Sequence, residues 1–72
     1  MSLDFVGIVP SLRPSTMAAI VADVLIAKKA APNIEQPLYE ALLRPYLHQL
    51  ILRVGDDWAK SMIEFAIDEA QR

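Results

Sequence analysis

The chain has 72 residues, of which 54% are hydrophobic, with a net charge of −2, one histidine and no cysteine. This composition excludes disulfides and thiolate metal sites, and a lone histidine argues against structural zinc. The acidic balance disfavours a protein that neutralises nucleic-acid phosphates. A chain of this size buries only about 60% of the surface that its unfolded form exposes, so some of its apolar surface is expected to meet a second copy or another protein.

Targeting signals and membrane spans are not expected. The N-terminal stretch MSLDFVGIVP contains Asp4 and no basic residue, unlike a signal peptide. The most apolar segment, residues 17–27, is about half as long as a bilayer span and contains Asp23. We therefore expect a cytoplasmic protein that forms a single helical domain over residues 1–72.

Residues 1–14 are expected to form an irregular arm. Their apolar residues follow neither a two-residue nor a 3.6-residue period, and Gly7, Pro10 and Pro14 prevent a long helix. The arm either folds back over its own bundle or reaches a second subunit or the sheet edge of a partner, and the sequence leaves both open.

A first helix is predicted over residues 15–30, with Ser15 or Thr16 as its N-cap and Pro32 just beyond its end. Apolar residues three and four apart predict its core face. They are Met17, Ile20, Val21, Val24 and Leu25. The opposite face carries alanines and Ile26, and it either meets solvent or lets another helix approach closely.

A second helix is predicted over residues 37–54, kinked near Pro45 but continuous through it. Continuity is expected because one apolar stripe extends on both sides of this proline. The stripe consists of Leu38, Leu42, Tyr46 and Leu50. Ile51 and Leu52 fall outside it, so we expect the segment after Pro45 to be buried on most sides.

A third helix is predicted over residues 57–71, with Gly55 ending the second helix and Asp56 or Asp57 as the new N-cap. Two apolar stripes cover about half of its circumference, which is wide for a three-helix monomer. One holds Trp58, Met62, Phe65 and Ala66, and the other holds Ala59, Ile63, Ile67 and Ala70. The predicted fold class is all-α, a small three-helix bundle (a helical hairpin plus one helix) whose short loops make neighbouring helices roughly antiparallel.

No set of residues in the sequence is typical of a catalytic site. His48 is the one general base of the usual kind, and its neighbours at helical spacing are Arg44 and Leu52, so we expect a half-exposed polar residue. Asp56 and Asp57 are expected to be caps rather than a catalytic pair. The sequence therefore predicts no enzyme, no cofactor, no metal ion and no small-molecule substrate.

A small DNA-binding regulator is the alternative. The second helix, the turn at 54–57 and the third helix can be read as a helix-turn-helix with the third as recognition helix. That helix begins with two aspartates and carries three further acids against two cations, so it would repel phosphates. Nucleic acid is therefore not an expected partner.

The predicted function is a non-enzymatic protein–protein interaction or assembly module, such as an accessory subunit, an adaptor, a phage structural protein or a protein inhibitor. Its expected partner is itself, as a homodimer or larger homo-oligomer, or another protein. Surplus apolar residues and aromatic residues are the candidates for partner binding. They are Ile26, Tyr46, Ile51, Leu52, Trp58 and Phe65. The sequence does not decide whether Trp58 lies in the core or at an interface.

Overall fold

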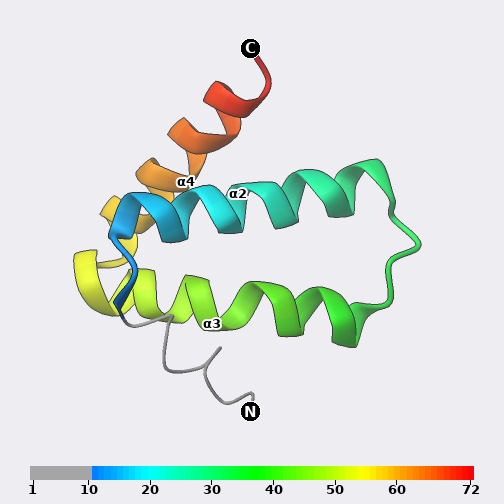
Figure 1. Ribbon diagram of the computed structural model, residues 1–72, viewed down its shortest axis with the longest axis horizontal. Helices are drawn as coiled ribbons and strands as arrows, with labels where there is room; N and C mark the ends of the chain where they lie inside the picture. The colour runs from blue at the N-terminus through cyan, green and yellow to red at the C-terminus, as the bar shows by residue number, and fades with distance from the viewer. Residues whose placement is uncertain (1–10) are drawn as a thin grey trace.

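The structure is a computed structural model, and it describes residues 11–72. It contains three helices: α2 (Pro14–Ala30), α3 (Gln36–Val54) and α4 (Asp56–Ala70) (Figure 1). The predicted all-α bundle is confirmed, and residues 11–72 contain no strand. Of the arm predicted at residues 1–14, residues 1–10 lie outside the described part of the chain.

Proline geometry, rather than a side-chain cap, begins α2. Arg13 is the N-cap, with an extended backbone (φ −71°, ψ 149°), and Pro14 takes the first helical position. A residue before proline prefers this extended conformation. The missing N–H of proline costs no hydrogen bond at the first helical position, because the first amides of a helix have no partner within it. No side chain caps this helix, so the N-cap predicted at Ser15 or Thr16 is wrong.

Lys28 holds the turn between α2 and α3. Its ammonium donates hydrogen bonds to the carbonyl oxygens of Ile34, at 2.8 Å, and Pro32, at 3.4 Å. The same Nζ lies 5.1 Å from the centre of the Tyr39 ring, within cation–π range. The last turn of α2 is thereby linked to the first turn of α3, and the two helices run antiparallel (Figure 1).

The second helix, α3, runs without a break through Pro45, which confirms the predicted continuity, while the kink near this proline stays a prediction. Tyr46 and Leu50 are buried on the side that faces the other helices, at 9% and 0% exposure. Leu52, two residues further on, is 65% exposed. The prediction that the segment after Pro45 is buried on most sides is therefore wrong, because α2 and α4 leave the outer side of α3 uncovered.

Gly55 alone connects α3 to α4. Its backbone (φ 92°, ψ 164°) lies in a region that is essentially restricted to glycine. Its amide donates to the carbonyl of Ile51 at 2.8 Å, and its carbonyl accepts from the amide of Ala59 at 2.9 Å. Gly55 ends α3 as predicted, but it is also the N-cap of α4. The predicted N-cap role of Asp56 or Asp57 is wrong, although their charge in the first turn suits the helix dipole.

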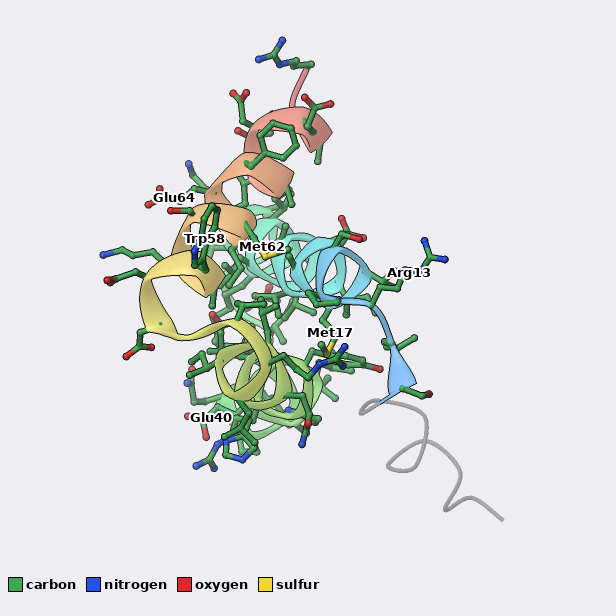
Figure 2. The ribbon with its side chains drawn as sticks, turned by 90° about the vertical axis from the view of Figure 1, so that its left-hand side faces the viewer. Arg13, Met17, Glu40, Trp58, Met62 and Glu64 are labelled. Atoms are coloured by element: carbon green, nitrogen blue, oxygen red, sulfur yellow. The ribbon has the colours of Figure 1, made fainter. Side chains whose placement is uncertain are left out.

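The core lies mainly along α2, which contacts both other helices, whereas α3 and α4 share the smallest contact. Its buried residues are Met17, Ala18, Val21, Ala22, Tyr46, Leu50, Ala59 and Ile63. Figure 2 shows Met17 between α2 and α3, whereas Trp58 projects from the outside of α4. Three of these eight buried residues are alanines, so the part of the core formed by residues 11–72 contains few large side chains.

The third helix, α4, crosses behind the N-terminal half of α2 and projects past it (Figure 1). Ala18 and Ala22 on α2 are buried, as is Ala59 on α4, and such small residues let two helices approach closely. The expectation that neighbouring helices are roughly antiparallel holds for α2 and α3 but not for α4, which runs obliquely across the bundle from the turn at Gly55 (Figure 1).

Candidate protein-binding groove

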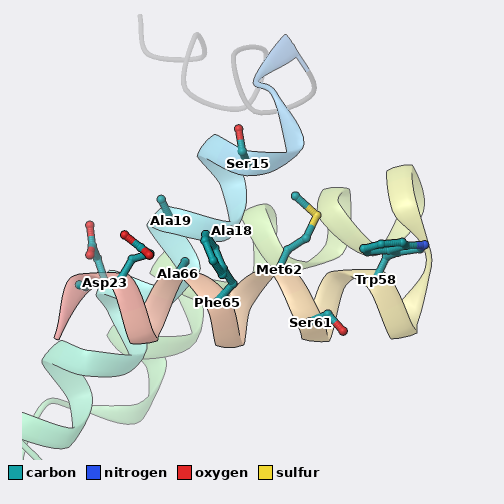
Figure 3. A pocket seen from close by; sticks show the side chains of 11 residues that line it. Ser15, Ala18, Ala19, Asp23, Trp58, Ser61, Met62, Phe65 and Ala66 are labelled. Carbon is teal, nitrogen blue, oxygen red and sulfur yellow. The ribbon is translucent and has the colours of Figure 1, made fainter. Parts of the chain in front are cut away.

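An apolar groove with a volume of about 730 Å³ runs between α2 and α4 (Figure 3). We call it the α2–α4 groove. Its lining consists of Ser15, Ala18, Ala19 and Asp23 from α2, and of Trp58, Ser61, Met62, Phe65, Ala66, Glu69 and Ala70 from α4. The two walls come from helices that are separated in sequence by the whole of α3.

The wide apolar sector of α4 explains why the groove is apolar. Ala59 and Ile63 turn one stripe of this helix into the core. Trp58 and Phe65 belong to the other stripe, and they remain 68% and 65% exposed. Because α4 presents one side to the bundle, an apolar sector of half its circumference leaves a stripe uncovered.

The α2 wall is made of small side chains. Ala18 is buried and Ala19 is exposed, and both line the groove. Since an alanine extends no further than its Cβ, the space over α2 stays open to a side chain from another helix. The walls are therefore unequal, one flat and one carrying large aromatic residues.

The two ends of the groove differ in hydrogen-bonding character. Figure 3 shows Trp58 at one end and Asp23 at the other. Glu69 also lies towards the Asp23 end, because it follows Trp58 by three helical turns. Among residues 11–72, Asp23 and Glu69 are the charged residues that line the groove. One end thus carries an uncharged indole ring, whose nitrogen points away from the groove (Figure 3), and the other end carries two carboxylate acceptors.

The structure brings together two of the six residues predicted to bind a partner, Trp58 and Phe65. Ile26 is half-buried on α2, outside the groove lining. Ile51 packs against the core and lines a smaller hollow of about 380 Å³ between α3 and α4.

The two remaining predicted residues lie on α3, at different depths. Tyr46 is a core residue and is not available to a partner in the folded chain. Leu52 is exposed on α3, away from both hollows.

Sequence reasoning missed the α2 wall. Ala18, Ala19 and Asp23 carry no hot-spot chemistry of their own, and they acquire a role only because α4 crosses beside them. Met62 shares a stripe with Trp58 and Phe65 in the sequence, so its place in the groove was open to prediction. The α2 residues could have been found from the alternative of a close helix approach on that face.

The described residues offer no other site of comparable definition. No group of three or more histidine, aspartate or glutamate side chains within residues 11–72 could hold a metal ion. His48 is exposed on α3, and it lines neither hollow. Over the same residues, the helices are too short or too polar to cross a membrane.

Comparison of the chain with protein-family models, curated proteins and solved structures found no match. A proposal about function therefore depends on the geometry and chemistry of the α2–α4 groove.

Proposed function

We propose that this chain is a non-enzymatic protein-binding module of the cytoplasm, an accessory subunit, adaptor or assembly protein, which takes an apolar helical segment into the α2–α4 groove. The observation that carries the proposal is the exposure of Trp58 and Phe65 beside an almost wholly apolar hollow. Contiguous apolar surface of this kind marks interaction sites, and tryptophan is among the residue types most enriched at binding hot spots.

The shape of the groove supports a helical occupant. Trp58, Met62 and Phe65 follow one another at the i, i+4, i+7 spacing that presents one face of a helix. From Trp58 to Glu69 the wall comprises twelve residues, and the eleven steps between them span about 16 Å at 1.5 Å per residue. About three turns of a partner helix match that length.

The exposed aromatic surface supplies a sufficient driving force. Covering the exposed parts of Trp58 and Phe65 removes roughly 250 Å² of apolar surface from water. At about 25 cal/mol per Å², this amounts to about 6 kcal/mol before the entropic costs of association are subtracted. The two aromatic residues are therefore expected to dominate the affinity.

Site-directed photo-crosslinking in the cell that produces the protein tests the proposal. A photoreactive phenylalanine analogue at Phe65 is expected to form adducts with protein, identified by mass spectrometry. The same analogue at Leu52, which is equally exposed on α3, is the matched control and is expected to give few adducts. Equal labelling from both positions, or no protein adduct from position 65, would refute a protein-binding groove.

A further inference from the structure

Resting on this proposed function, we infer that the groove is occupied by α4 of a second copy of the same chain, antiparallel to the first about a two-fold axis. In this register Trp58 of one copy lies opposite Glu69 of the other, and Met62 lies opposite Phe65. Each α4 then serves both as a wall of its own groove and as the occupant of the other groove.

The two-fold rotation places each end of the groove of one copy against the opposite end of the groove of the other copy, and these two ends are complementary. A two-fold interface uses the same patch on both copies, so the patch must be complementary to itself. The antiparallel register brings the uncharged indole ring of Trp58 to the carboxylate end formed by Asp23 and Glu69, and it does so twice. A parallel register would instead gather the acids of both copies at one end, where they repel one another.

The charges at the ends of α4 favour the same register. Asp56 and Asp57 are exposed in its first turn, where they line the smaller hollow between α3 and α4, and Arg72 is exposed just beyond its last turn. The antiparallel register places Arg72 of each copy within one helical turn of the two aspartates of the other. Arg72 now pairs with Asp68 at 2.8 Å, but this pair is exposed, and such pairs contribute little, so Arg72 can change partner.

The small core supplies an independent reason for a second copy. A 72-residue chain without cysteine has oligomerisation as its main remaining support. Of the eight buried apolar residues among positions 11–72, three are alanines, while Trp58 and Phe65 contribute their large side chains to the surface. Pairing through α4 gives these aromatic residues the burial that the single copy does not provide.

The first test is the mass of the purified protein by analytical ultracentrifugation across a hundredfold dilution. A dimer is expected, and Phe65→Gln should raise its Kd by about tenfold or more. Leu52→Gln is the matched control, because Leu52 has the same exposure on α3 and should leave Kd unchanged. A monomer at every concentration overturns the inference, as does a dimer that Leu52→Gln weakens and Phe65→Gln does not.

The second test exchanges the charges at the two ends of α4 to determine the register of the two α4 helices in the dimer. Arg72→Glu alone should raise Kd by about fivefold, and so should the double variant Asp56→Lys with Asp57→Lys. A mixture of the two variant chains should form heterodimers with wild-type affinity, because both contacts are then attractive. Arg44→Glu on α3 is the control for net charge, and circular dichroism verifies that each variant stays helical.

Failure of this inference is distinguishable from failure of the proposed function. A heterodimer no tighter than either variant homodimer overturns the antiparallel register. A monomeric protein whose position 65 forms adducts with other proteins overturns the second copy as occupant, while the protein-binding function stands. Absence of any protein adduct at position 65 overturns both.

Discussion

Gly55 shows how much of this fold depends on one residue without a side chain. It is the whole connection between two helices, and its φ of 92° with ψ of 164° is strained for any L-residue with a Cβ. A Cβ built there would meet nothing within 4 Å, so space is not the obstacle. The requirement for glycine is purely conformational.

Gly55→Ala is therefore expected to lower the free energy of unfolding by about 1–3 kcal/mol, measured by urea denaturation. The control is D-alanine at the same position in a chemically synthesised chain. It adds the same methyl group but favours positive φ, so it should recover most of the loss. Equal stability of the two alanine forms would show that backbone strain is not the cause.

A second prediction at the residue scale concerns Lys28. Lys28→Ala removes its hydrogen bonds to the turn carbonyls and its contact with Tyr39, so we expect a loss of about 1–2 kcal/mol in unfolding free energy. Lys29→Ala, at the next and exposed position, should change stability by less than about 0.5 kcal/mol. Similar losses of unfolding free energy in both variants would show that Lys28 contributes only a positive charge at the end of the helix, as Lys29 does.

At the scale of elements, the position of each helix was predictable within one or two residues, because proline and glycine act locally. The C-cap at Gly55 was predictable, but the N-caps of α2 and α4 were not, since Pro14 and Gly55 fix the backbone before Ser15 or Asp56 can accept a hydrogen bond. The burial of α3 was also not predictable, because a helix that is apolar on several sides does not reveal which side its neighbours will cover.

Substitution of two leucines, one on each face of α3, distinguishes the buried face of this helix from its exposed face. Leu50→Ala is expected to destabilise the protein by about 2–5 kcal/mol, because Leu50 is fully buried and its loss leaves a cavity. Leu52→Ala, two residues away and mostly exposed, should cost less than about 1 kcal/mol. Thermal and urea unfolding of both variants check the assignment, and the reverse order would place the core on the other face.

At the scale of the whole molecule, the sequence could name one wall of the candidate groove but not the other. The wide apolar sector of α4 already indicated that Trp58 or Phe65 had more surface than one bundle could bury. The α2 wall depends on the crossing of α4, which is set by Gly55 and by the close approach of helices at buried alanines. A crossing angle is a tertiary property, so the small residues of α2 indicated that a helix could approach this face but not that Ala18 and Ala19 would line an open groove.

Substitutions of two neighbouring alanines on α2 distinguish an effect on core packing from an effect on binding in the α2–α4 groove. Ala18→Leu is expected to destabilise the fold by about 1–3 kcal/mol, because Ala18 is buried. Ala19→Leu should leave unfolding free energy nearly unchanged, since its side chain is exposed in the groove. It should nevertheless suppress protein adducts at position 65 by filling the space. Adducts that persist in Ala19→Leu would argue that the occupant does not enter the groove.

The walls of the α2–α4 groove belong to helices that meet only in the folded chain, so binding and folding are thermodynamically linked. An occupant that binds the folded state and ignores the unfolded chain raises the unfolding free energy by about 2.7 kcal/mol at a hundred times its Kd. The melting temperature of this protein should therefore rise with the concentration of whatever fills the groove. At cellular dilution, the lifetime of the folded chain would depend on the abundance of its partner.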